Sequence, residues 1–391
     1  MDYNLIHIIT DNGEIQMNTY IRKVSLLLAI IYALSQSLTT KGLTGTQSLP
    51  NLKTNISKRI IMLGELVPGG PGKDGIPSID SPVFTNPEIA QEWLSPNEPV
   101  ISIAIENQAR AYPLQILIWH EIVNDTIEKV PVAVTFCPLC YSANVFDRRV
   151  NGGVFEFGVS GMLRNSDMVM YDRQTESLWQ QITGQAIVGD MVGSTLKSIP
   201  AQIISFEQFR SVYENGLVLS RKTGYRRDYG RNPYAGYDDI KNSPFKYNGK
   251  KDDRLLPMEK VVTLSLGDSN MAYPYSVTKK IRVINDKISD MQIAIFHTDG
   301  AVSALDKERI ASSRQDGSTG VFNRQLDDRL LSFRYHQGKI IDEQTSSNWN
   351  ITGLATEGPL KGKQLKPLPH GDYFAFAWLA FKPETEIYKP K

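Results

Sequence analysis

The sequence predicts an α+β fold in which strands dominate and two related units follow one another. The chain has 391 residues, of which 41% are hydrophobic and 22% charged, so it is long enough for two buried cores. Its apolar runs are short, rich in β-branched and aromatic residues, and bounded by turn residues, which is typical of strands. Similar motifs also recur in the same order in the two halves, which indicates an internal duplication.

The internal similarity begins at Val100 in the first half and at Val261 in the second. The matching stretches are Ala-Tyr-Pro at 111–113 and 272–274, Asn-Asp at 124–125 and 285–286, and YDRQTESLWQQITGQA at 171–186 with IDEQTSSNWNITGLA at 341–355. Chance could supply one such pair, whereas three in the same order favour two copies of one unit. We therefore expect Trp179 and Trp349 to be equivalent and largely buried.

The N-terminal segment has the pattern of an export signal. Arg22 and Lys23 precede the apolar run VSLLLAIIYAL at 24–34, and the small polar residues SQS follow it. As a helix this run would span roughly 16 Å, which is short of the roughly 30 Å bilayer core. We interpret residues 1–37 as a signal peptide or N-terminal anchor, with Met17 as an alternative start and a buried helix as the alternative structure. The protein is then extracytoplasmic, either secreted or anchored on the outer face of the cytoplasmic membrane.

The rest of the chain divides where its composition changes. Residues 38–65 have the composition of a polar spacer, 66–222 form the first strand-rich unit, and 258–391 form the second. The linker between the units, 223–257, is rich in Tyr, Arg and Gly and has little apolar periodicity. An ordered surface loop and a lid over a cleft both fit this segment.

Few segments have the pattern of helices. We expect helices at 113–125, 205–216 and 374–383, and Ser205 is placed to cap the second of them. Strands and turns then account for most of the remaining chain.

The two cysteines of the chain, Cys137 and Cys140, lie in one Cys-Pro-Leu-Cys motif at the end of a predicted buried strand. A structural disulfide across so short a loop would stabilise the fold by only about 2 kcal/mol. A redox pair has this spacing, but strand-like residues follow the motif where a helix would stabilise the thiolate. A metal ion would hold both thiolates directly. We therefore favour a metal site and keep a thiol–disulfide redox pair as the alternative.

Further ligands must come from other parts of the chain. His120 is the favoured third ligand, because the predicted helix that holds it leads into the strand ending at Cys137; a packing role is its alternative. His297 matches Cys137 in the second repeat and Met168 carries a thioether, so both are candidate fourth ligands. Sulfur and imidazole suit copper and zinc alike, and the spacing does not choose between the two metals.

A polar loop between two predicted strands contains candidate substrate-binding residues. Arg164, Asn165 and Asp167 lie in this loop, and Glu121 follows His120. A well-capped turn is the alternative interpretation of the loop.

The net charge of +1 gives no indication of a nucleic-acid partner, so an unidentified small molecule or protein is expected, with membrane association through the N-terminus. The chain has no Gly-x-Ser-x-Gly elbow, His-Glu-x-x-His helix or dinucleotide fingerprint, so the common hydrolase and dehydrogenase classes lose support.

Six stretches, in this order, carry a resemblance to a known family: GGPGKDGIPSID, AYPLQILIWHEIVND, TFCPLCYSANVFDR, SGMLRNSDMVMYDRQTESLWQQITGQA, YGRNPYAGY and PLPHGDYFAFAWLAFKPETEIY. From about Leu66 to Tyr388 the chain resembles the proteins catalogued as domain of unknown function 3179. The resemblance implies an extracytoplasmic bacterial or archaeal protein and no established activity. The Cys-Pro-Leu-Cys and Trp-His-Glu elements of that family are intact here.

The sequence thus predicts an extracytoplasmic protein of unknown reaction that carries a copper or zinc site at Cys-Pro-Leu-Cys. Two alternatives stay open. One is a thiol–disulfide redox protein that uses the same cysteines. The other is a non-catalytic module that binds a ligand or partner between its two units, with the cysteines as a staple. The residues do not decide whether the protein is an enzyme.

Overall fold

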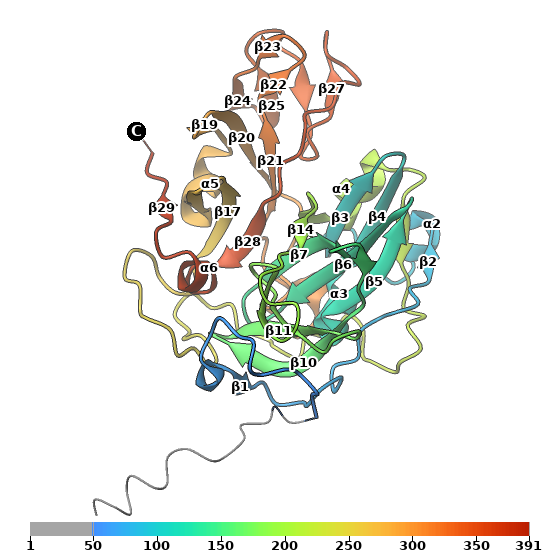
Figure 1. Cartoon of the computed structure of the whole chain (residues 1–391). Coiled ribbons are helices and arrows are strands. Elements are labelled where there is room, and N and C mark those ends of the chain that lie inside the picture. Colours follow the sequence, from blue (N-terminus) through green and yellow to red (C-terminus); the bar gives the residue numbers. More distant parts are fainter. Residues whose placement is uncertain (1–48, 50, 391) are drawn as a thin grey trace, which may run out of the picture. The chain divides into compact units, whose positions relative to one another are not determined.

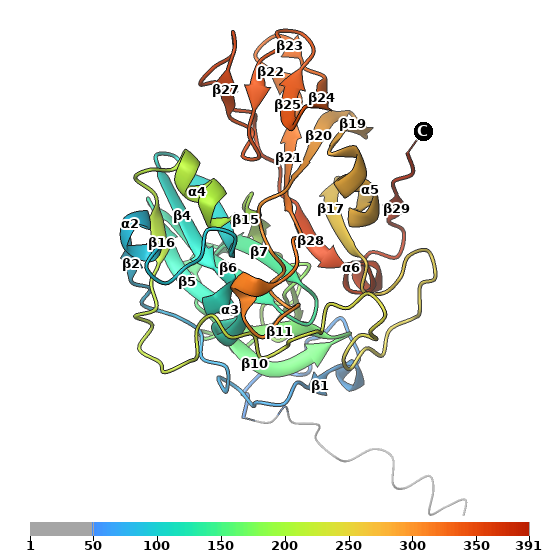
Figure 2. The ribbon, with the colours of Figure 1, turned by 180° about the vertical axis from the view of Figure 1, so that it is seen from behind.

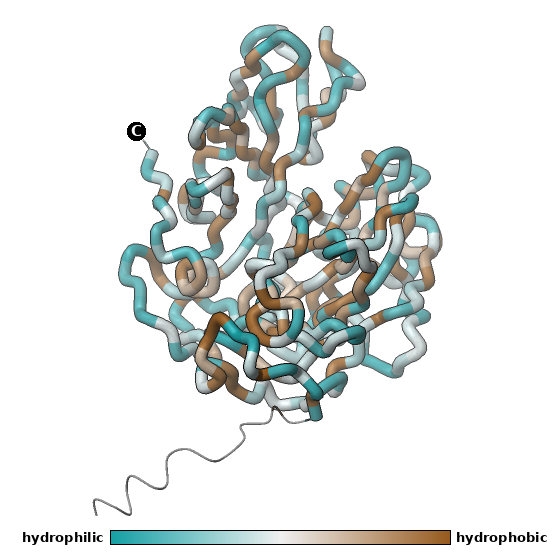
Figure 3. The backbone as a smooth tube through the Cα atoms, in the orientation of Figure 1, coloured by the Kyte–Doolittle hydropathy of each residue, from teal (hydrophilic) through white to brown (hydrophobic). Residues whose placement is uncertain are grey.

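Strands form most of the secondary structure in the computed structural model, which describes residue 49 and residues 51–390 (Figure 1). The predicted strand-dominated α+β class is confirmed. The longest helices in this part of the chain have seven residues, and none of the described helices is long and apolar enough to cross a membrane. Figure 3 shows hydrophobic and hydrophilic residues alternating over short distances along the chain. The predicted signal or anchor at 1–37 lies outside the described residues.

The first half begins with a lead-in segment and continues through a series of hairpins. Its elements are η1 (Leu63–Glu65), β1 (Val67–Pro68), β2 (Phe84–Thr85), α2 (Pro87–Ala90), β3 (Pro99–Ile105), β4 (Gln108–Pro113), α3 (Leu114–His120), β5 (Ile122–Ile127), β6 (Val130–Cys137), β7 (Ser142–Asp147), β8 (Arg149–Val150), β9 (Gly153–Val154), β10 (Phe157–Arg164), β11 (Asp167–Asp172), β12 (Leu178–Gln180), β13 (Gln185–Val188), β14 (Lys197–Ser198), β15 (Gln202–Ser205), α4 (Phe206–Val212) and β16 (Leu217–Leu219).

The second half follows the linker. Its elements are β17 (Lys260–Leu266), β18 (Ser269–Pro274), α5 (Tyr275–Ile281), β19 (Val283–Ile288), β20 (Met291–Thr298), η2 (Ile310–Ser312), β21 (Ser318–Asn323), β22 (Gln325–Leu326), β23 (Arg329–Leu330), β24 (Phe333–His336), β25 (Lys339–Asp342), β26 (Asn348–Trp349), β27 (Ala355–Glu357), β28 (Gly371–Phe374), α6 (Ala375–Phe381) and β29 (Glu386–Ile387).

Three sheets of the first half surround its core. Their strand orders are β15-β3-β4-β16-β2, β14-β7-β6-β5 and β1-β10-β11-β12-β13. β6 pairs with antiparallel neighbours on both sides, and all of its residues except Val130 are buried. A strand covered on both faces favours the continuous apolar run that the sequence has here. Cys137 therefore ends a strand in the interior of the protein.

From β17 onward the elements follow the same order as those from β3, except that β14 and η2 each occur in one half only (Figures 1 and 2). The sheet β28-β17-β18-β29 matches β15-β3-β4-β16, with the last strand parallel to its neighbour in both cases. The registers also agree, because Val100 pairs with Pro113 and Val261 pairs with Pro274. The short helix after this hairpin ends at a residue with positive φ in each half.

Buried polar contacts correspond between the halves as well. Trp179 Nε1 donates to Asp172 Oδ2 at 2.8 Å, and Trp349 Nε1 donates to Asp342 Oδ2 at 3.0 Å. Trp179 is 0% exposed and Trp349 is 4% exposed, so their predicted burial is confirmed. A buried indole N–H needs a hydrogen-bond acceptor, and each half supplies it from the preceding hairpin.

All three expected helices occur, but those predicted at 113–125 and 205–216 are shorter, ending at His120 and Val212. α4 begins after Ser205, whose hydroxyl accepts from Gln208 N–H while the Gln208 side chain accepts from Ser205 N–H. α6 lies within 374–383. The prediction of a helix through residue 125 was wrong, because α3 ends at His120 and Glu121 adopts φ 58°. The β-branched Ile122 and Val123 then start β5, where both are buried.

Two segments without regular sheets or long helices lie over the first half. Residues 51–66, most of which belong to the segment assigned to a polar spacer, place Leu52, Ile56, Ile61 and Leu63 against the buried residues of β11–β13. The linker 223–257 contains turns and one isolated bridge from Arg231, and four of its tyrosines, Tyr229, Tyr234, Tyr237 and Tyr247, pack against the main core.

Candidate metal centre

The Cys-Pro-Leu-Cys motif forms the turn of the β6–β7 hairpin. Cys137 pairs with Ser142 across the hairpin, and Cys140 N–H donates to the Cys137 carbonyl at 3.2 Å. Tyr141 leaves the turn with φ 53°. No helix follows, as the sequence predicted, so no helix dipole acts on the thiols. Both cysteines are free and buried.

Asp167 comes from a second hairpin, β10–β11, whose turn residues Asn165 and Ser166 both have positive φ. Its Oδ2 accepts from Gln180 Nε2 at 2.5 Å and from Ile182 N–H at 3.0 Å. Its Oδ1 is buried and has no hydrogen-bond partner among the described residues. Buried polar atoms are rarely left unpaired, so this oxygen is available as a ligand atom.

The two hairpins bring three potential metal ligands together. One ligand atom each from Cys137, Cys140 and Asp167 lies within 4.8 Å of the others, and all three residues are buried. The hairpins meet because they belong to the same core, in which Cys137, Cys140 and Met168 are all packed. Within the described chain, no other group of histidine, cysteine or acidic residues converges in this way.

The centre contains acidic groups without a compensating cation. Burial raises the pKa of Asp167 to about 7. Burial, and then the charge of Asp167, raises the pKa of Glu121 to about 8. Burial, followed by Cys137 and Asp167, raises the pKa of the Cys140 thiol well above its usual value. Burial therefore disfavours the charged form of each of these groups, and a cation bound by Asp167 and the thiols would favour the charged forms of its own ligands.

The structure does not bring His120, the favoured third ligand, to the cysteines. Its Nδ1 lies 2.7 Å from the Pro77 carbonyl, and its Nε2 lies 2.7 Å from the Tyr229 hydroxyl. Both ring nitrogens therefore have hydrogen-bond partners, and the ring packs beneath the linker beside Tyr225 and Tyr229. This arrangement corresponds to the packing alternative. Asp167, and not His120, is the third residue of the converging group.

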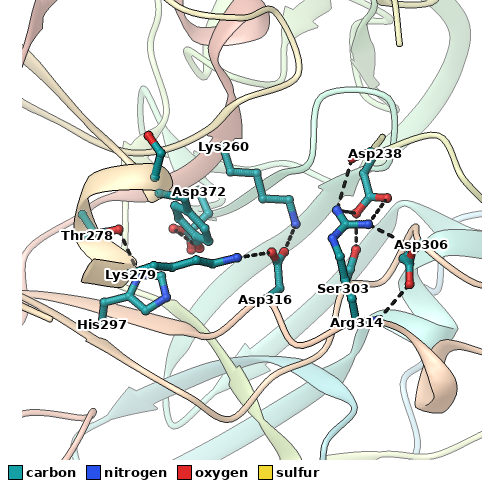
Figure 4. A network of polar contacts seen from close by, with 12 residues as sticks. Asp238, Lys260, Thr278, Lys279, His297, Ser303, Asp306, Arg314, Asp316 and Asp372 are labelled. Atoms are coloured by element: carbon teal, nitrogen blue, oxygen red, sulfur yellow. Dashed lines mark hydrogen bonds and ion pairs between the residues drawn. The ribbon is translucent and has the colours of Figure 1, made fainter. Parts of the chain in front are cut away.

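His297 does not belong to the converging group, and Met168 lies next to Asp167 in the chain. His297 is buried in β20, with its Nδ1 2.9 Å from Thr278 Oγ1, in the network of Figure 4. Met168 follows Asp167 in β11 and is buried. It lines a cavity together with Glu121.

The residues expected to bind substrate have separate roles. Arg164 donates to Glu65 at 2.9 Å and to Gln180 at 3.3 Å, so it braces the side chain that holds Asp167. Asn165 occupies the turn, as the capped-turn interpretation expected. Glu121 is buried beside the cavity. Asp167 was identified for substrate binding, and its position beside the thiols could not be read from the loop alone.

The linker and the second half cover the Cys-Pro-Leu-Cys turn. The Tyr237 hydroxyl donates to the Leu139 carbonyl at 3.1 Å, and Phe374 N–H donates to the Cys140 carbonyl at 2.9 Å. Lys260 Nζ lies 3.1 Å from the centroid of the Tyr141 ring. Figure 4 shows the same lysine directed at Asp316, which also pairs with Lys279. The turn is thus fixed from three sides.

A family model described as a protein of unknown function, DUF3179, matches residues 73–385. The chain belongs to the DUF3179 family. The predicted resemblance is therefore confirmed, and the matched range contains both hairpins of the candidate centre as well as the linker. Neither a curated protein nor a solved structure matches the chain. The description of the DUF3179 family assigns no activity, so the chemistry of the site has to be inferred from its geometry.

Proposed function

We propose that this protein binds one zinc ion through the thiolates of Cys137 and Cys140 and the carboxylate of Asp167. The observation that carries the proposal is the convergence of these three groups within 4.8 Å, in a buried place where Asp167 Oδ1 has no partner among the described residues. Zinc–ligand distances of about 2.0–2.3 Å place tetrahedral ligands roughly 3.5 Å apart. Small side-chain adjustments would therefore close the site.

The ligand types favour zinc over copper. Thiolates suit both Zn²⁺ and Cu⁺, whereas a carboxylate is a common zinc ligand and a poor partner for Cu⁺. The bound ion would displace the thiol protons and pair with the buried carboxylate of Asp167. Three protein ligands leave a fourth position for water or a substrate atom, which is the arrangement of reactive rather than purely structural zinc sites.

Metal analysis of the purified full-length protein tests this proposal. We expect about one equivalent of zinc, and a loss of at least tenfold in zinc affinity for Cys137→Ser and for Asp167→Asn, because each removes an anionic ligand. His120→Gln is the matched control and should keep its zinc, since the ring nitrogens of His120 bind Pro77 and Tyr229.

Each alternative has its own outcome in the same experiment. A quantitative Cys137–Cys140 disulfide with no zinc would contradict the metal site and support the redox protein. Zinc-free protein with two free thiols, whose folding and ligand binding survive Ser at both positions, would support the non-catalytic binding module. Copper in place of zinc would overturn the choice of metal, and zinc lost from His120→Gln would overturn the ligand set.

The proposed place of action is outside the cytoplasm, with an unidentified small molecule or protein as partner. The support is the basic-then-apolar pattern at 21–34, which lies outside the described residues. Expression with the intact N-terminus followed by cell fractionation tests it, and we expect the protein in the secreted or membrane-anchored fraction. A full-length chain soluble in the cytoplasm would contradict this proposal.

We also propose that the zinc centre lies in one copy of a duplicated unit. The support is the shared order of elements, the matching registers and the equivalent tryptophan contacts. The registers of β5–β6 and β19–β20 put Thr298 at the position of Cys137 and His297 at that of Phe136, so the predicted match of His297 with Cys137 was wrong and the second copy lacks the thiols. In a crystal structure, residues 95–222 and 258–388 should superpose with Trp179 on Trp349; different strand connections would contradict a duplication.

A further inference from the structure

A cavity of about 210 Å³ lies beside the candidate metal centre. Its walls come from the lead-in loop, β10, β11, the Cys-Pro-Leu-Cys turn and the linker. Among the lining side chains, Glu121 and Tyr234 carry the hydroxyl or carboxyl groups, and the others are apolar or glycine. None of the three proposed zinc ligands lines the cavity.

Glu121 places a buried carboxyl group in this mostly apolar cavity. The residue is 7% exposed, and no hydrogen bond or ion pair from the described residues reaches its carboxyl. Its backbone has φ 58°, a conformation that costs a non-glycine residue roughly 1 kcal/mol or more. Hydrogen bonds from its N–H to Leu117 O at 2.7 Å and from Phe136 N–H to its C=O at 2.8 Å maintain that conformation.

The loops that close the cavity are fixed by specific contacts. Ser166 Oγ donates to the Phe245 carbonyl, and Lys246 Nζ donates to the Pro68 carbonyl, so the linker is tied to both neighbouring walls. Gly161 has φ +77°, and a Cβ there would lie 2.4 Å from the Pro71 carbonyl oxygen. Only glycine lets the lead-in loop pass so close to β10. The cavity is therefore a formed part of the fold.

We propose that this cavity binds a compact, uncharged and mostly apolar molecule that presents a carbonyl oxygen to the Glu121 carboxyl. The volume is below the roughly 300–1,000 Å³ of sites for drug-sized ligands, so the molecule is small. Apolar walls favour an apolar body, and the buried Glu121 carboxyl, which has no partner among the described residues, sets its orientation. The acidic residues nearby disfavour an anion.

The small number of polar groups in the cavity also argues against a cation. A bound ammonium group would leave water for a site in which only Glu121 and Tyr234 could replace its hydration. A neutral carbonyl loses less hydration free energy than an ammonium group on leaving water. It needs one hydrogen-bond donor, which the protonated Glu121 carboxyl supplies. The proposal does not depend on zinc, because the lining residues and the zinc ligands are different side chains.

The test uses the full-length protein with cyclohexanone as the probe, measured by isothermal titration and ligand-observed NMR. Cyclohexylammonium and cyclohexanecarboxylate, which have rings of the same size, are the charged comparisons. We expect saturable binding of cyclohexanone and at least tenfold weaker binding of both ions. Glu121→Gln keeps a donor and should bind within about threefold of the wild type, whereas Glu121→Leu should bind roughly five- to tenfold more weakly.

A cavity-filling variant keeps the test decisive if Glu121→Leu fails to fold. Met162→Trp should abolish cyclohexanone binding, and Leu330→Trp, at a 43% exposed position in the second half, should leave it unchanged. Cys137→Ser should keep cyclohexanone binding while losing zinc, which separates this proposal from the metal site. No saturable binding, equal binding in Met162→Trp, or preferential binding of cyclohexylammonium would each overturn the proposal.

Discussion

His297 shows how the fold controls the charge of a single residue. It is 1% exposed, and its ring packs edge-to-face against Tyr275 at a centroid distance of 5.0 Å. Burial, and then the positive charges of Lys279 and Arg282, lower its pKa to about 4, although Asp316 acts in the opposite direction. The folded protein therefore keeps this histidine neutral at pH values where the unfolded chain protonates it.

The lowered pKa makes stability depend on pH with a definite sign. Between about pH 6.5 and 4 the unfolded chain binds one more proton at His297, so stability falls as the pH falls through this window. His297→Gln should remove that part of the loss, on the order of 2 kcal/mol. Urea unfolding of the wild type and of His297→Gln at pH 7 and pH 4.5 measures this difference. An equal pH dependence of stability in the two proteins would show that His297 is not held neutral.

The capping box of α4 shows how one element is joined to distant parts of the chain. Besides bonding Ser205, the Gln208 side chain donates to Thr298 Oγ1 at 3.0 Å and to the Asp299 carbonyl at 2.9 Å. It also accepts from Ser318 Oγ at 2.5 Å. A helix-start residue in the first half therefore holds two strands of the second half.

The two members of the capping box should accordingly differ in their contribution to stability. Ser205→Ala loses one cap and should cost about 1 kcal/mol. Gln208→Ala loses the reciprocal cap and the contacts to the second half, so it should cost more, roughly 2 kcal/mol. Chemical denaturation gives both values, and equal costs would mean that the contacts of Gln208 with the second half contribute little.

At the scale of the whole described molecule, an ion-pair network joins the linker to the second half (Figure 4). Arg314 pairs with Asp238 of the linker at 2.6 Å and with Asp306 at 3.0 Å. The Asp238 side chain is 0% exposed and also accepts from Ser303 Oγ. All the carboxylates and cations of this network have partners, which indicates a role in holding the linker over the Cys-Pro-Leu-Cys turn.

Removing the Arg314 guanidinium should therefore lower the free energy of unfolding by more than the partial exposure of this side chain indicates. Arg314→Met leaves Asp238 buried without its guanidinium and should cost roughly 2–3 kcal/mol, discounted because Arg314 is 42% exposed. Lys339→Met, in an exposed pair with Glu357, is the control and should leave the unfolding midpoint unchanged. A midpoint for Arg314→Met that equals that of the control would contradict the proposed role of the network.

Local patterns in the sequence determined the strand-dominated class, the cap at Ser205, the buried tryptophans and the importance of the two cysteines. These features depend on neighbouring residues, since alternation, turn residues and capping act over a few positions. The end of α3 was missed because one left-handed residue, Glu121, turns a helical pattern into a strand, and its conformation depends on contacts with β6.

The composition of the site was decided only by the tertiary structure. Cys137 and Asp167 are far apart in the sequence, and they meet because two hairpins with separate patterns pack into one core. His120 is closer to the cysteines in the sequence, yet the fold directs both of its nitrogens to Pro77 and Tyr229. Which polar groups are left without partners is a property of packing between distant segments, and no local pattern in the chain records it.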